Sequence, residues 1–463
     1  MQQNSDRSLI LTTTQNRLEL RDSTFYTDSF LGETTVNRVN DAPHTTTEAG
    51  IAYRPALPTL VVCATLLSAQ LLPEAPVYFG AASSFSVGTI LSATLISLCA
   101  LIFVHIFQRK STRTLLDSPA FGLQVVLLVL AVVFIQAVAA NHILPIDKTR
   151  FAESFAPLVV LFSGGIAISA VFSLALASQL DSAARVSFWV LLGVILIRLL
   201  HMEPPGAHFD HPTFPFTETS HFALAFGPIY IYRCATCRPS HRTLWILFGL
   251  ALGVALKSAT LLVFVFGGAL ISRRFIFALA ITTIPLAAGA ATHLSYFTSR
   301  ADISSHSSSV SALVYLQGWD FLLSSLQRTH GIGLGFQQLG VHSLHLEISH
   351  LIRLADGGGN LNQYDGSFLL SKLGSEFGLL GILLVAVYCV YGLKMLRAFR
   401  FGMTSPHRAL AQCIFIGFAV DIFTRGMGYF CGSTLLFIGA TLSLNNHHSQ
   451  SRNLSSRYSA ISL

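Results

Sequence analysis

Charged side chains are scarce in this chain of 463 residues. Asp, Glu, Lys and Arg together make up 11% of the residues, whereas apolar residues make up 52%. Because a soluble domain usually has about 25% charged residues, the composition excludes an ordinary soluble protein. The apolar residues form continuous runs, such as 121–139 and 157–177, rather than the short alternating segments of a membrane β-barrel. The chain is therefore predicted to be an all-α, polytopic membrane protein.

The long polar stretch of the chain contains no cysteine that could form the disulfide bonds of a secreted domain. The seven cysteines fall in or near apolar runs or in a short loop, and none lies in the long polar stretch 293–366. This distribution excludes a disulfide framework. Cys234 and Cys237 have the spacing of half a zinc site, but no second pair follows them. We expect no metal and no other cofactor.

About twelve apolar segments approach the length needed to cross a membrane as helices. Lys and Arg gather in cytoplasmic loops of membrane proteins, so their positions test the topology. With the N-terminus inside, the inner loops carry 13 of these residues, and the outer side carries 7 spread over far more loop. This asymmetry predicts cytoplasmic termini and an even number of spans. The segments are 58–73, 86–107, 119–140, 156–178, 184–200, 220–232, 243–256, 259–272, 275–292, 368–393, 409–423 and 428–444.

The apolar region, 54–445, is predicted to be one transmembrane helical domain between two polar tails. Residues 1–53 lack periodicity and are expected to be a disordered cytoplasmic tail, and 446–463 form a cytoplasmic C-terminal tail. Two outer loops stand out, 201–219 and 293–366. Loops as long as the second are usually functional or disordered, and its apolar spacing predicts an amphipathic helix on the membrane surface.

The outer basic residues are candidates for binding an anion because they depart from the charge asymmetry. Arg198 ends a span just before the first loop, where a guanidinium fork suits a phosphate; helix anchoring by snorkelling is the alternative. Lys257 lies between two short apolar segments and has the same two interpretations. Arg425 follows Asp421 by four residues, so the two are expected to form an ion pair on one helix, or Arg425 lines a substrate cavity.

Glu218 lies at the expected start of a helix, after the first loop. A carboxylate at such a position often caps the helix. It is also a candidate general base, because desolvation raises the pKa of a glutamate toward neutrality. Four nearby histidines are weaker candidates: His201, His208, His211 and His221.

A glycine run in the second loop resembles a phosphate-cradling segment. Gly331, Gly333 and Gly335 alternate with apolar residues and follow Arg328 and His330. The spacing is not that of a dinucleotide site, and no βαβ unit surrounds it. Backbone amides together with outer guanidinium groups would suit a pyrophosphate. The plain alternative is a tight turn before a surface helix.

The order of these features resembles the polytopic family of O-antigen polymerases (Wzy-type) and O-antigen ligases. The resemblance covers roughly residues 190–440. The matching features, in chain order, are Arg198 before an outer loop, the Phe-Thr-Glu218-Thr-Ser-His-Phe-Ala segment, Lys257-Ser258, Tyr315-Leu-Gln-Gly318-Trp319, the glycine run, and a re-entry helix with Ser-Lys-Leu-Gly-Ser-Glu376-Phe-Gly-Leu-Leu-Gly381.

The resemblance implies a metal-independent glycosyltransferase of the bacterial inner membrane that acts at the periplasmic face. It transfers a growing glycan from undecaprenyl pyrophosphate onto the next lipid-linked repeat unit. The implied partners are this lipid-linked glycan, membrane lipids and a chain-length regulator; nucleic acid is not expected, because the topology accounts for the net charge of +7. The expected catalytic residues are Glu218, Arg198 and Arg328, and the expected substrate-binding residues are Arg300, Lys257, Arg425, His330 and Gly333.

Two alternatives remain open. Ligases typically carry His-Asn at the start of the re-entry helix, where this chain has Asp365-Gly366-Ser367. This departure favours a polymerase over a ligase that joins finished glycan to lipid A-core, although His345 or His350 could substitute in space. A lipid-linked oligosaccharide flippase or other transporter would show an internal repeat and short outer loops, and the sequence shows neither.

Overall fold

The computed structural model describes residues 56–82, 84–108, 117–200, 213–271, 298–300, 302–342, 346–355 and 366–445. The chain divides into two units, Met1–Ala52 and Tyr53–Leu463, and every described residue belongs to the second. The described residues are mostly helical and include no strand. The predicted tails, the first outer loop up to residue 212 and the predicted span at 275–292 lie outside them.

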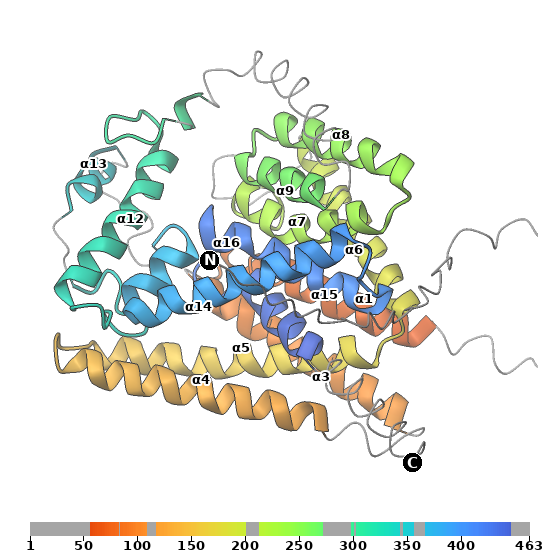
Figure 1. Cartoon of the computed structure of the whole chain (residues 1–463), viewed down its shortest axis with the longest axis horizontal. Helices are drawn as coiled ribbons and strands as arrows, with labels where there is room; N and C mark the ends of the chain where they lie inside the picture. The colour runs from red at the N-terminus through yellow and green to blue at the C-terminus, as the bar shows by residue number, and fades with distance from the viewer. Residues whose placement is uncertain are drawn as a thin grey trace, which may run out of the picture. The chain divides into compact units, whose positions relative to one another are not determined.

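The helices fall into three consecutive groups along the chain (Figure 1). The first group is α1 (Ala56–Leu71), α2 (Ala75–Tyr78), α3 (Phe85–Gln108), α4 (Asp117–Asn141), α5 (Lys148–Leu174) and α6 (Ala177–Leu199). The second is α7 (Thr219–Thr236), α8 (Pro239–Ala255) and α9 (Ala259–Leu270). The third is α12 (Val310–Arg328), α13 (Glu347–Ala355), α14 (Leu369–Arg400), α15 (Pro406–Gly417), α16 (Ala419–Phe423) and a further helix, Gly432–Asn445.

Among the described residues, five helices are long and apolar enough to cross a membrane. They are Phe85–His105, Gly122–Asn141, Lys148–Leu174, Ala177–Leu199 and Leu369–Arg400. Four shorter apolar helices accompany them: Leu57–Leu71, Ser240–Ala255, Ala259–Leu270 and Gly432–Asn445. Each coincides with a predicted apolar segment. The protein is therefore an all-α membrane protein.

Small residues allow the long helices to approach closely, as is common between helices in membranes. In α5, a Cβ on Gly164 would lie 2.7 Å from Cβ of Ala93 in α3. A Cβ on Gly165 would lie 2.4 Å from the Ile438 side chain of the last helix. The α5 backbone therefore packs directly against two neighbours, and Figure 1 shows α4 on another side of it.

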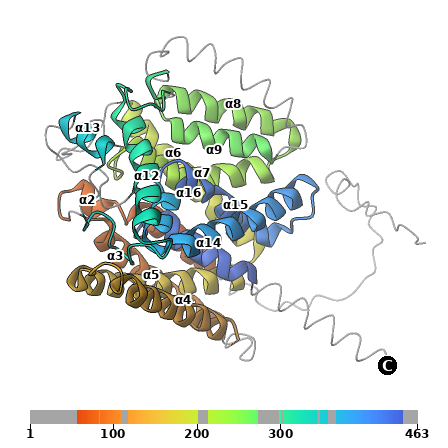
Figure 2. The ribbon, with the colours of Figure 1, turned by 60° about the vertical axis from the view of Figure 1, so that its left-hand side comes forward.

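Helices α7, α8 and α9 form a compact group (Figure 2). Gly227 of α7 packs on Phe264 of α9, and Tyr230 one turn later packs on Gly268. Contacts that advance together along both helices mean that α7 and α9 run parallel. Their N-terminal ends therefore lie at the same end of the group, and Ser258 caps α9 there by accepting the Leu261 N–H at 3.3 Å.

The amphipathic helix expected in the second loop forms α13, but its apolar face has a protein partner. Ile348 and Ile352 pack on Leu313 and Val314 of α12. Leu354 is 68% exposed. The helix was predicted to lie on a membrane surface; in the structure, Ile348 and Ile352, two of the apolar residues that gave this periodicity, cover α12.

Candidate functional site

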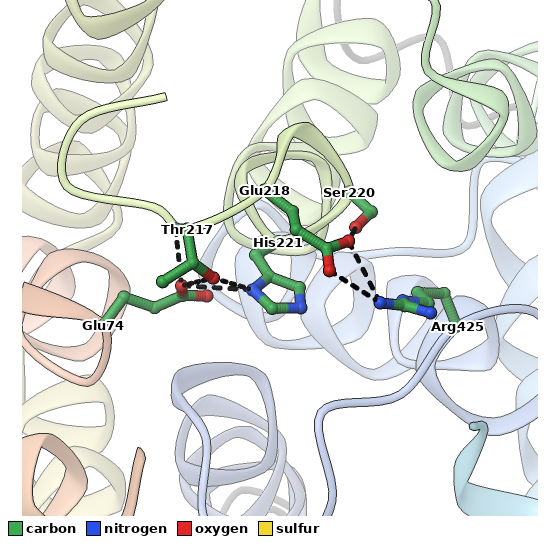
Figure 3. Close-up of polar contacts among 6 residues, drawn as sticks. All are labelled: Glu74, Thr217, Glu218, Ser220, His221 and Arg425. Atoms are coloured by element: carbon green, nitrogen blue, oxygen red, sulfur yellow. Dashed lines mark hydrogen bonds and ion pairs between the residues drawn. The ribbon is translucent and has the colours of Figure 1, made fainter. Parts of the chain in front are cut away.

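Three segments far apart in the sequence meet beside the start of α7 (Figure 3). Glu74 follows α1, Thr217 precedes α7, and His221 lies in the first turn of α7. Arg425 follows α16 and precedes the last helix. Figure 3 shows two contacts side by side: Glu74 with Thr217 and His221, and Glu218 with Arg425.

Arg425 and Glu218 form an ion pair. Nη2 of Arg425 lies 3.1 Å from Oε1 and 3.0 Å from Oε2 of Glu218. The Ser220 hydroxyl donates a further hydrogen bond to Oε2 at 2.7 Å. The Arg425 side chain is 18% exposed and that of Glu218 is 51% exposed. Glu218 occupies the N-cap position of α7, but its side chain makes no capping hydrogen bond, so its interaction with Arg425 replaces the expected cap.

These neighbours lower the pKa of Glu218 from an ordinary value of 4.5 to about 2. Desolvation raises the pKa, but the Arg425 charge opposes it most strongly, aided by His221, the Ser220 hydrogen bond and Arg300. The sequence had suggested that burial would raise this pKa toward neutrality, and that expectation is wrong. A carboxylate that holds its charge so firmly is a poor proton acceptor near neutral pH.

Glu74, Thr217 and His221 form a second, buried polar cluster. Glu74 Oε2 lies 3.1 Å from Nδ1 of His221 and accepts the Thr217 N–H at 3.1 Å and its hydroxyl at 3.2 Å. The Thr217 hydroxyl is also 2.9 Å from Nδ1. A carboxylate beside Nδ1 favours the tautomer with the proton on Nδ1, which leaves the Nε2 lone pair as the proton acceptor.

The cluster lines a small pocket with room for about one water molecule. Glu74 and His221 line it together with Ser433 from the last helix. Apolar lining comes from Phe216 and Met427, among others. Two ionisable groups and a hydroxyl thus converge on this pocket.

Asp421 and Arg425 do not pair, which corrects the ion pair expected from their spacing. Helix α16 ends at Phe423, so the two residues do not share a helical face. Asp421 accepts a hydrogen bond from the Ser433 hydroxyl at 2.6 Å, and Arg425 turns to Glu218 instead.

Of the predicted anion-binding residues, Arg425 pairs with Glu218, and the charge of Arg300 also lowers the pKa of this carboxylate. Arg198, at the end of α6, donates to the Thr213 hydroxyl at 2.6 Å and so reaches the segment that leads into α7. Lys257 is exposed in the turn between α8 and α9, at the end where α7 begins.

Arg328 and His330 lie at the end of α12 and are both exposed. Desolvation and the Arg328 charge lower the pKa of His342, so the side chains of Arg328 and His342 are near one another. His330 adopts a positive φ of 51° in the turn that follows α12. The turn that follows α12 is joined to α14 by the hydrogen bond from the Leu379 N–H to the Gly331 carbonyl.

The glycine run packs into a break in α14. Gly378 interrupts that helix with φ 61° and ψ −137°, and the Leu379 N–H donates to the Gly331 carbonyl at 2.8 Å. The Gly333 N–H donates to the Thr329 hydroxyl at 2.9 Å. This corrects the expectation that Gly333 offers its amide to a phosphate. The run is a structural segment.

A buried carboxylate fixes the residues that follow the run. Glu376 of α14 accepts the backbone N–H of Gln337 at 3.0 Å and of Leu339 at 3.4 Å. Lys372, one helical turn earlier, is 1% exposed, and its Nζ lies 5.1 Å from the ring centroid of Tyr429. The re-entry motif of the sequence therefore organises the second loop against α14.

Within the described part of the chain, no group of three or more His, Cys, Asp or Glu side chains is arranged to hold a metal ion. The seven cysteines are free thiols.

Sequence reasoning missed Glu74. A usable signal was present, because this carboxylate lies between Pro73 and Pro76 at the C-terminal end of the first apolar segment. His221 was considered only as a weak candidate, since nothing in the sequence paired it with a residue 147 positions away.

Comparisons with models of known protein families, with curated proteins and with solved structures give no match to this chain.

Proposed function

We propose that this protein is a membrane-embedded glycosyltransferase. It polymerises undecaprenyl-pyrophosphate-linked oligosaccharide repeat units into O-antigen or exopolysaccharide. It acts at the periplasmic face of the bacterial inner membrane, without a metal. About twelve spans place both termini in the cytoplasm and the loops 201–219 and 293–366 in the periplasm. The proposal starts from the order of sequence motifs, and the geometry around Arg425 carries it further.

The observation that carries the proposal is the state of Arg425. Its Nη2 binds Glu218, while its Nε is buried and has no hydrogen-bond partner among the described residues. Leaving a buried donor unsatisfied costs about 1–3 kcal/mol. A phosphate oxygen bound at Arg425 would satisfy it, and the charge of Arg300 already acts on the same place. Two guanidinium groups suit a pyrophosphate, whose charge grows as it leaves.

The chemistry is a single displacement at the anomeric carbon of the donor glycan. The bond from this carbon to the phosphate oxygen breaks, and a bond to the acceptor hydroxyl oxygen forms. The hydroxyl proton passes to a base, and undecaprenyl pyrophosphate leaves with the bonding electron pair. Arg425 and Arg300 stabilise the leaving group, and Glu218 holds Arg425 in position until the substrate arrives. Arg198, Arg328 and Lys257 are proposed to hold further phosphate or sugar oxygens.

Disruption of the gene separates this function from the two alternatives. For an O-antigen product, loss of a polymerase leaves surface lipid A-core that carries a single repeat unit. Loss of an O-antigen ligase leaves long chains on undecaprenyl pyrophosphate and none on lipid A-core. Loss of a flippase leaves single lipid-linked units in the cytoplasmic leaflet. The proposal predicts the first pattern, and either of the others would replace it. A chain-length regulator is the proposed protein partner.

A further inference from the structure

A proton acceptor is still needed, and Glu218 is poorly suited to the task. Its carboxylate is paired with Arg425, and its pKa is about 2. Proton-transfer catalysis is most effective when the pKa of the base lies close to the working pH. A carboxylate with so low a pKa is therefore a weak base near neutral pH. The base must come from elsewhere at this end of the molecule.

The Glu74–His221 pair holds an imidazole with one ring nitrogen left to accept a proton, whereas the Glu218 carboxylate is paired with Arg425. Both side chains are buried, with 2% exposure for Glu74 and 7% for His221. Glu74 and Thr217 fix the ring through Nδ1. No hydrogen bond to Nε2 is found among the described residues, and Figure 3 shows this nitrogen directed away from Glu74, toward the side where Glu218 and Arg425 lie.

Both residues also line a small pocket with room for about one hydroxyl group or water molecule. Phe216 and Met427 supply apolar lining to the same pocket. The electrostatic influence of Glu218 and of Arg425 on His221 places the ion pair close to this ring. The pocket and the arginine therefore form adjacent halves of one site.

We propose that His221 is the catalytic base that accepts the proton of the acceptor sugar hydroxyl, and that Glu74 is the positioning residue that orients it. The hydroxyl oxygen attacks the anomeric carbon, its proton moves to Nε2, and the bond to the departing phosphate breaks. The imidazolium that forms is stabilised by the Glu74 carboxylate. The pocket between α1, α7 and the last helix then admits the acceptor hydroxyl. This inference rests on the proposed polymerase activity.

The groups that act on His221 come from four segments. Glu74 precedes α2, Glu218 precedes α7, Asp421 belongs to α16 and Arg425 follows it. Three of these are carboxyls and one is a guanidinium. Of these four groups, Glu74 is the one that contacts the ring, at Nδ1, so this contact sets the tautomer and orientation of the ring.

The test is the pH dependence of the polymerisation rate of the full chain in lipid nanodiscs, supplied with undecaprenyl-pyrophosphate-linked repeat units. The wild type is expected to gain rate as the pH rises and His221 loses its proton. His221→Gln is expected to lose about 10²–10⁴-fold in kcat, to lose this rise with pH, and to keep its KM for the lipid-linked donor.

Glu74→Gln is expected to lose at least about tenfold in kcat, because the ring is no longer held in one tautomer. Glu74→Asp, which keeps the charge, is expected to recover part of that rate. His142→Gln is the matched control, since His142 is exposed in the turn after α4. Melting temperatures in detergent identify any variant that fails to fold, in which case the Glu74→Asp and Glu74→Gln comparison decides.

The outcomes separate the two proposals. A wild-type ladder with an unchanged rate and pH profile in His221→Gln would overturn the assignment of the base and leave the polymerase intact. An equal loss in Glu74→Asp and Glu74→Gln, with the pH profile kept, would reduce the pair to a structural role. A wild type that forms no ladder at any pH would remove the polymerase activity itself.

Discussion

Arg425 holds Glu218 with both carboxylate oxygens within 3.1 Å of one guanidinium nitrogen, across 207 residues of sequence. Because the Arg425 side chain is only 18% exposed, the pair is screened from water on one side. A bound pyrophosphate would compete with Glu218 for this arginine. The pair therefore links the resting structure to the binding of substrate.

Replacing Arg425 should abolish polymerisation while the protein still folds. Arg425→Ala removes the guanidinium that is proposed to stabilise the leaving phosphate, and loss of such a group typically costs about 10²–10³-fold in rate. Arg425→Lys should recover little, because an ammonium group lacks the planar fork. Chain length on a gel measures the effect. Arg353→Ala is the control, since this arginine is exposed on α13; equal ladders from all three variants would contradict the role of Arg425.

Acid should weaken the fold through Glu218. The pKa of this group is about 2 in the folded protein and 4.5 ordinarily, so the unfolded chain binds more protons as the pH falls. The stabilisation is therefore complete above pH ~4.5 and is lost as the pH drops toward ~2. Glu218→Gln should show a shallower loss of melting temperature across this range. Parallel curves for the wild type and the variant would show that the ion pair contributes nothing.

Gly333→Ala should destabilise the protein strongly. A Cβ there would lie 2.4 Å from the Glu376 carbonyl oxygen, and φ is +90°. Such a backbone conformation alone costs about 1–3 kcal/mol for a residue with a side chain, and the clash adds to it. Gly193→Ala is the matched control, because nothing lies within 4 Å of its added Cβ in α6 and alanine favours a helix by about 1 kcal/mol. Melting temperatures should fall for the first variant and stay level or rise for the second.

Arg328→Ala should prevent long chains while leaving membrane insertion intact. Arg328 is exposed at the end of α12, so its loss costs the fold little, whereas a substrate phosphate would lose a charged contact. Arg198→Ala is expected to behave alike, with the added loss of its hydrogen bond to Thr213. Long chains from both variants in cells would remove the two arginines from the site.

The helices could be predicted from the sequence because continuous apolar runs determine them locally. The long helix beginning at Leu369 and the helix pair around Lys257 coincide with predicted segments. Glu218 was singled out because it follows a proline-rich loop and precedes an apolar run. Such local patterns are sufficient to locate helices and their ends.

The partners within the site could not be predicted, because they depend on tertiary packing. Glu74 and His221 are 147 positions apart, and no local pattern joins them. Asp421 and Arg425 have helical spacing, yet the helix ends between them. The glycine run looked like an anion cradle, but its shape fits the break at Gly378 in α14, and that break was not visible in an apolar run.

The most direct measurement is the product pattern of the purified chain in lipid nanodiscs with one undecaprenyl-pyrophosphate-linked repeat unit as the only substrate. The proposed polymerase should release undecaprenyl pyrophosphate and build a ladder of products that differ by one repeat unit, and Arg425→Ala should release none. Unconsumed substrate, or a single product that appears only when lipid A-core is added, would contradict polymerisation.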